Sequence, residues 1–224
     1  MDAGPPVRSA NHEPQTNQIM DDFLIYLRLG FDHITDFRGY DHILFIVALC
    51  AVYTLRQWRQ VLILVTAFTI GHSITLALAT LRLINYSTAL VELLIPVTIL
   101  IAAITNFFYK EPKKRLLPAA KRPTTKGRYA LAVVFGLIHG MGFSNYLRSL
   151  LGREANIVEP LLAFNIGLEI GQLVIVSLVL GLAFLVIDLL KSSRFRWTLI
   201  VSGIVAGMAL SLILDNKELG GMLK

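Results

Sequence analysis

The fold is decided by one long apolar stretch in the C-terminal half of the chain. Residues 158–190 read VEPLLAFNIGLEIGQLVIVSLVLGLAFLVIDLL and contain only three charged residues, Glu159, Glu169 and Asp188. A helix that crosses about 30 Å of hydrocarbon needs about 20 apolar residues, so this stretch can span a bilayer if it tilts or projects beyond it. Its polarity does not alternate as a lipid-facing barrel strand requires, and we therefore predict a helix.

Five other apolar segments have the same character, at roughly 41–55, 61–83, 87–109, 129–151 and 198–214. The 224-residue chain is 55% hydrophobic and 16% charged, whereas soluble domains carry about 25% charged residues. These values exclude an ordinary soluble enzyme, a disordered chain and, with Cys50 as the one cysteine, a disulfide scaffold. We predict an all-α polytopic membrane helix bundle of six to seven transmembrane helices, forming a single domain over residues 19–214.

The two ends of the chain are predicted to lie outside this bundle. Residues 1–18 are polar and proline-containing, and we expect either a native tail or a processing remnant there; residues 215–224 form a short C-terminal tail. Apolar residues recur every fourth position from Ile19 to Phe31. This spacing predicts a short interfacial helix over 19–31 that lies at the membrane surface.

Basic residues indicate the orientation. The loop 110–128 holds eight basic residues and one acid, so its net charge is +7, while the rest of the chain sums to −1. A nucleic-acid partner is therefore not expected, and the lipid bilayer is the expected surroundings. The positive-inside rule predicts that loop 110–128 is cytoplasmic and that both termini are outside.

Small residues recur four positions apart in two of the segments. They are Gly136, Gly140 and Ser144 in the fourth segment and Gly203, Gly207 and Ser211 in the sixth. Such spacing allows close helix approach. We expect both sets of small residues to pack closely against other helices of the bundle. The alternative is that these helix faces form the contact of a homo-oligomer.

Polar residues inside apolar spans carry the functional information, because an ionisable group there is unfavourable and usually serves a purpose. They are His42, His72, Glu92, His139, Asn165, Glu169 and Gln172, with Asp32, His33, Asp36 and Asp41 near the mouth of the first span. We expect His33 in a surface loop, Asp41 and His42 at the outer face, and His72 and His139 near mid-span. All of them map to the outer half or the middle of the bundle, which predicts one polar chamber that opens to the outside.

Imidazole and carboxylate donors together suit nickel, zinc, iron or cobalt rather than magnesium or calcium. The expected metal ligands are His33, Asp41, His42, His72, His139 and Glu169. Glu92, Asn165 and Gln172 are expected to hydrogen-bond to the ligands rather than to the metal. The alternative is that each buried histidine only hydrogen-bonds between helices.

Four motifs point to a known family. They are GYDHILF at 39–45, AFTIGHSITL at 67–76, FGLIHGMGF at 135–143 and FNIGLEIGQ at 164–172. In this order they resemble the HupE/UreJ family of bacterial membrane proteins over residues 30 to about 210. The resemblance implies a multi-pass inner-membrane protein that serves metal supply, chiefly of nickel for hydrogenase and urease. Asp41-His42 matches the Asp-His element of nickel permeases, with His33 upstream at a wider spacing.

Two mechanisms follow, and a structural membrane subunit is the third possibility. In a transporter, a divalent transition metal passes Asp32, Asp36 or Asp41 and loses water to the chamber histidines, with Glu169 balancing its charge. In an intramembrane metal-dependent hydrolase or oxidase, the metal stays bound and activates a water molecule, with Glu92 or Glu169 as general base. The substrate is then a lipid or a membrane peptide that is reached from the outer face. The resemblance favours the transporter.

Overall fold

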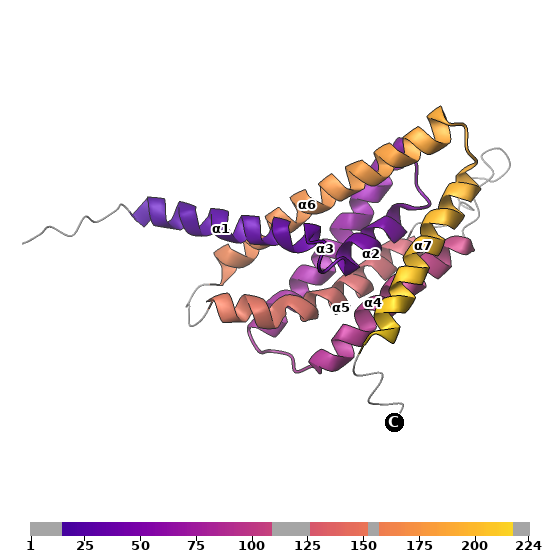
Figure 1. Ribbon diagram of the computed structural model, residues 1–224. Helices are drawn as coiled ribbons and strands as arrows, with labels where there is room; N and C mark the ends of the chain where they lie inside the picture. The colour runs from indigo at the N-terminus through magenta and orange to yellow at the C-terminus, as the bar shows by residue number, and fades with distance from the viewer. Residues whose placement is uncertain (1–14, 109–125, 152–156, 217–224) are drawn as a thin grey trace, which may run out of the picture.

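The computed structural model describes residues 15–108, 126–151 and 157–216, and helices account for most of them (Figure 1). The elements in chain order are α1 (Gln15–Thr35), α2 (Asp41–Cys50), η1 (Leu55–Gln57), α3 (Trp58–Thr80), α4 (Thr88–Phe107), α5 (Lys126–Leu151), α6 (Val158–Phe184), η3 (Leu185–Leu189) and α7 (Arg194–Leu214). No strand occurs in these three ranges. Most of the tails and of the basic loop 110–128 lies outside them.

Five helical stretches are long and apolar enough to cross a membrane. They are Leu55–Thr80, Thr88–Phe107, Gly127–Leu151, Val158–Leu189 and Arg194–Leu214. Each corresponds to one predicted segment, so the prediction of an all-α membrane helix bundle is confirmed. The chain is a multi-pass membrane protein.

The first predicted span has a different form. Instead of a helix over 41–55, the structure has the 10-residue helix α2, which rises only about 15 Å. Asp36 Oδ1 accepts a hydrogen bond from the backbone N–H of Arg38 at 2.8 Å, and this local turn separates α1 from α2. The His42 ring centroid lies 6.1 Å from that of His72 and 5.1 Å from that of His139, so His42 is level with these residues of α3 and α5. The location of Asp41 and His42 at the outer face stays a prediction.

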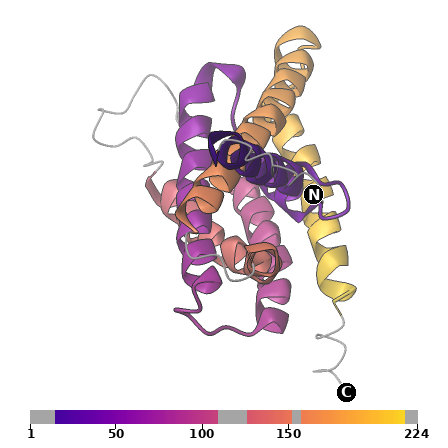
Figure 2. The same cartoon turned by 90° about the vertical axis from the view of Figure 1, so that its left-hand side faces the viewer.

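Helix α1 contains the predicted segment 19–31 and extends it in both directions. Its C-terminal half packs against α6, as both views show (Figures 1 and 2). A Cβ atom on Gly30 would collide with the carbonyl oxygen of Phe164, and one on Gly167 with that of Leu27, so the two backbones touch. His33 therefore lies in a packed helix, and its predicted loop position is wrong. The surface location of the N-terminal half of α1 stays a prediction.

Glycines also bring α3 and α5 into backbone contact. A Cβ on Gly136 would collide with the carbonyl oxygen of Phe68, and one on Gly140 with that of His72. The close packing predicted for this face is confirmed. It is wrong for α7 within this chain, because a Cβ on Gly203 or Gly207 meets nothing within 4 Å. A homo-oligomer stays a prediction.

The two ends of the bundle differ in charge. The end at which α3, α5 and α7 begin carries a concentration of basic side chains, and we call it the basic end. These residues are Arg56, Arg59, Arg128, Lys191, Arg194 and Arg196. The predicted cytoplasmic location of this end stays a prediction.

Candidate metal site

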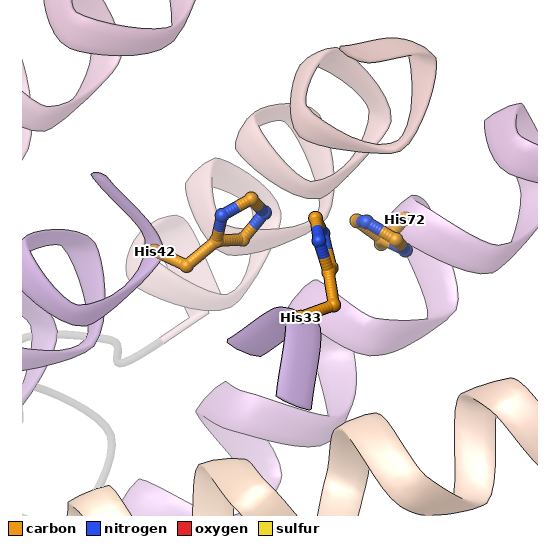
Figure 3. Close-up of side chains that lie close together, drawn as sticks. All are labelled: His33, His42 and His72. Atoms are coloured by element: carbon orange, nitrogen blue, oxygen red, sulfur yellow. The ribbon is translucent and has the colours of Figure 1, made fainter. Parts of the chain in front are cut away.

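Four of the chain's five histidines meet in the interior of the bundle. His33 lies in the last turn of α1, His42 in the first turn of α2, His72 in α3 and His139 in α5. Figure 3 shows the rings of His33, His42 and His72 grouped between their helices. His42, His72 and His139 are buried, and His33 is partly buried. Imidazole donors from four separate helices thus lie close together in the interior of the bundle.

The spacing of these rings suits a metal ion. One ring nitrogen from each of His33, His42 and His72 lies within 4.8 Å of the other two. At Zn–N bonds of 2.0–2.1 Å, tetrahedral donors stand about 3.4 Å apart, so small side-chain rotations bring these three onto one ion. The centroid of His139 is 5.1 Å from that of His42, which makes His139 a neighbour of this three-histidine cluster.

Hydrogen bonds at Nδ1 orient two of the four imidazole rings, those of His42 and His139. His42 Nδ1 lies 3.0 Å from Asp41 Oδ1, and His139 Nδ1 lies 2.9 Å from the carbonyl oxygen of Phe135. Because these oxygens are acceptors, Nδ1 of each ring carries a proton, and in the neutral imidazole Nε2 then keeps a free lone pair. Metal-binding histidines in proteins are held by this same kind of contact to a carboxylate or a carbonyl.

Five of the six remaining ring nitrogens are buried without a hydrogen-bond partner. They are Nε2 of His33, Nε2 of His42, both ring nitrogens of His72 and Nε2 of His139. A buried polar atom without a partner is unfavourable by about 1–3 kcal/mol. A metal ion satisfies several imidazole lone pairs at once, so the donor set fits a transition-metal ion of the class that binds imidazole.

Aromatic side chains close the cluster on the side of the basic end. Phe45 and Phe68 pack with ring centroids 4.9 Å apart, and Phe135 lies 5.6 Å from Phe45. The Phe45 and Phe68 rings are 5.2 and 5.3 Å from His139. We call these three residues the aromatic floor. It separates the histidines from the basic end and lowers the local dielectric constant.

The opposite side of the cluster leads to a cavity of about 740 Å³. His33 lines this cavity as well as belonging to the cluster, together with Asp32, Asp36, Arg38 and Phe143. Asp32 forms an exposed ion pair with Arg28 at 3.5 Å. The cavity thus offers a carboxylate-lined approach to His33, as the sequence predicts for the mouth of a chamber.

The polar residues of α6 lie elsewhere, along its seam with α3. Ser73 Oγ donates to Asn165 Oδ1 at 2.6 Å, Thr69 Oγ1 donates to Gln172 Oε1 at 2.8 Å, and Thr66 Oγ1 donates to Glu169 Oε1 at 2.7 Å. The structure therefore brings none of the three into the histidine cluster.

Glu92 also lies apart from the imidazoles. It is exposed and lines a cavity of about 270 Å³ with Arg38, Asp41 and Pro96. Of the predicted ligand set, the structure gathers His33, His42, His72 and His139, with Asp41 bound to His42. It leaves out Glu169.

Sequence reasoning missed one polar group in the half of the bundle near the basic end. Asn106 is buried and bonds to α2, α5 and α7, and Arg128 is one of its partners. The signal was an amide at the end of an otherwise apolar span, followed by an arginine at the start of the next one. Both resemble ordinary helix ends in the sequence.

Comparison with known proteins agrees with the motifs. The family described as HupE / UreJ protein matches residues 9–216, which is nearly the whole chain. No curated protein and no solved structure matches the chain. The chain belongs to the HupE/UreJ family.

Proposed function

We propose that this HupE/UreJ protein binds a divalent transition-metal ion at His33, His42 and His72 and carries it across the membrane. The observation that supports this most is the set of three imidazole nitrogens within 4.8 Å of one another, delivered by three helices. His139 provides a further donor beside His42, on the side of the aromatic floor. The protein's function would then be metal supply through the inner membrane, with loop 110–128 in the cytoplasm.

The donor chemistry favours the later metals of the first transition series. Imidazole binds zinc, copper, iron and nickel, whereas magnesium and calcium prefer oxygen ligands. Among the described residues the cluster holds no thiolate, because Cys50 lies at the far end of α2. Membership of a family associated with nickel makes nickel the first candidate cargo, with cobalt and zinc as close alternatives.

Transport is favoured over catalysis by the positions of the carboxylates. A metal-dependent hydrolase needs a general base near the metal-bound water. In the described part of the chain, Glu169 hydrogen-bonds to Thr66, Glu92 is in a separate cavity, and Asp41 is bound to His42. A mobile cargo, by contrast, needs only donors that bind and release, and the approach past His33 provides access.

Binding can be tested by titrating the purified protein with Ni²⁺, Co²⁺, Zn²⁺ and Mg²⁺ in a calorimeter. We expect about one transition-metal ion per chain and no Mg²⁺ binding. Replacing His42 or His72 by alanine should weaken binding at least about 100-fold, more than the loss of a residue that only orients a ligand. His12→Ala is the matched control, because it removes the fifth histidine of the sequence, which belongs to the polar segment 1–18.

Transport requires a second readout. Protein in liposomes that contain a metal-sensitive dye should admit Ni²⁺ or Co²⁺, and His72→Ala should abolish this uptake while His12→Ala leaves it unchanged. Equal uptake by the wild type and the His72→Ala protein would contradict the proposal. Tight binding without any uptake would instead favour a retained, catalytic metal.

A further inference from the structure

Asn106 ties four helices together near the basic end. Its Nδ2 donates to the carbonyl oxygen of Ala48 in α2 at 2.7 Å and to Ser202 Oγ in α7 at 3.1 Å. Its Oδ1 accepts from Arg128 Nη2 in α5 at 3.1 Å. The side chain is 2% exposed. Both donor hydrogens and the acceptor oxygen of the amide are thus engaged.

The same place is where α2 ends inside the bundle. The last carbonyls of a helix have no partner within it. Here Thr198 Oγ1 donates to the carbonyl oxygen of Ala51 at 3.0 Å, and Arg194 donates to that of Val52. Two guanidinium groups, Arg128 and Arg194, face the negative end of the α2 dipole. We call the side chains Asn106, Arg128, Arg194, Thr198 and Ser202 the clasp.

Helix α2 connects the clasp to the metal site. His42 is in its first turn, Phe45 of the aromatic floor follows one turn later, and Ala48 is one turn beyond that. A metal ion that leaves His42 toward the basic end therefore passes the floor and then meets the clasp. Helix α2 packs against α3, α4, α6 and α7, and Figure 1 shows it in the interior of the bundle.

Arg128 places a fixed positive charge at that point. Its guanidinium carbon lies 5.5 Å from the Tyr53 ring centroid, in addition to its bond with Asn106. In a region of low dielectric constant, like charges a few Å apart repel by several kcal/mol. A single arginine excludes cations from some pores in this way.

We infer that Asn106 and Arg128 form the gate through which the metal ion leaves the histidine cluster toward the basic end. The inference rests on the proposed metal passage. In the closed state, the clasp fixes the end of α2 and Arg128 repels the cation. Release of the bonds to Asn106 frees the end of α2, displaces Arg128 and opens the path past the aromatic floor.

The chain carries its own reporter of this opening. Cys50 is the one cysteine in the sequence, it is the last residue of α2, and it is 0% exposed. Its reaction with N-ethylmaleimide therefore measures how often the end of α2 is released. This measurement needs no metal and does not depend on transport.

The charge of the gate is tested by metal passage into dye-loaded liposomes. We expect Arg128→Gln to pass Ni²⁺ about tenfold faster than the wild type and Arg128→Lys to stay within about twofold of it. Arg196→Gln is the control, because it removes an exposed arginine from the same end. Passage through Arg128→Gln at the wild-type rate would overturn the inference while leaving the proposed function intact, provided that the wild type passes Ni²⁺.

The clasp itself is tested by Cys50 labelling of detergent-solubilised protein. We expect Asn106→Leu to be labelled at least about tenfold faster than the wild type and Arg196→Gln at the wild-type rate. Nickel affinity should stay within about threefold of the wild type, because the histidines are not altered. Unchanged labelling, or fast labelling with lost affinity as in an unfolded protein, would overturn the gate. A wild type that neither binds nor passes Ni²⁺ would refute the proposed function instead.

Discussion

The contact between Asp41 and His42 gives a prediction whose size follows from the geometry. Asp41 Oδ1 lies 3.0 Å from His42 Nδ1 and also accepts from the His42 backbone N–H at 2.9 Å. This carboxylate therefore fixes the ring, keeps the proton on Nδ1 and makes Nε2 a better metal donor. Its replacement should weaken metal binding although Asp41 does not itself contact the ion.

The two informative changes are Asp41→Asn and Asp41→Ala. An asparagine oxygen still accepts from Nδ1 but carries no charge. Hydrogen bonds to charged groups contribute about 1.5–3 kcal/mol and neutral ones about 0.5–1.5 kcal/mol. The difference of about 1–1.5 kcal/mol corresponds to about five- to tenfold in affinity. Alanine removes the acceptor altogether, and we expect about 10–100-fold weaker binding.

Calorimetric titration with Ni²⁺ or Zn²⁺ at constant pH measures these losses. Asp36→Asn is the matched control, because it removes an equal charge from the cavity near His33 without touching the ring of His42. Its equilibrium affinity should stay within about twofold of the wild type. An Asp41→Asn protein with wild-type affinity, or equal losses for Asp36→Asn and Asp41→Asn, would refute the orienting role.

Three further predictions concern packing, capture and orientation. Gly136→Val should lower the melting temperature by several degrees, because overpacking costs about 1–3 kcal/mol. Gly203→Val should leave the melting temperature unchanged, because a Cβ at Gly203 meets nothing within 4 Å. Equal shifts of the melting temperature in the two variants would contradict the packing. Asp36→Asn should slow the initial uptake of Ni²⁺ at low salt and lessen the salt dependence of uptake, since exposed charges steer cations. If uptake by Asp36→Asn had the salt dependence of the wild type, capture through the cavity beside His33 would be contradicted. In a Cys50→Ala background, Ala119→Cys should not react with an impermeant maleimide outside intact cells, and ready labelling would invert the proposed orientation.

Hydropathy predicted the long spans because their apolar surface is continuous. It failed at 41–55, where apolar residues continue past Cys50 but the backbone does not remain helical. Hydropathy placed the start of this segment at residue 41, where α2 does begin. An average over residues does not register the break after Cys50, so it predicted a longer span than the structure has.

The depth of polar residues was enough to predict that histidines converge. It was not enough to assign Glu169, because depth says nothing about the direction in which a side chain points. Packing fixes that direction, and here Glu169 turns toward Thr66 on α3. The position of His33 depends on the fit of Gly30 against α6, which only the assembled helices reveal.

The central claim is that His33, His42 and His72 share one transition-metal ion. X-ray absorption at the nickel edge of the Ni²⁺-loaded protein tests it most directly, because imidazole rings give characteristic outer-shell scattering. The account predicts about three imidazoles per nickel in the wild type and a loss of about one in His33→Ala, with no change in His12→Ala. A spectrum dominated by water or carboxylate oxygen, with the same imidazole content in the wild type and His33→Ala, would contradict the account.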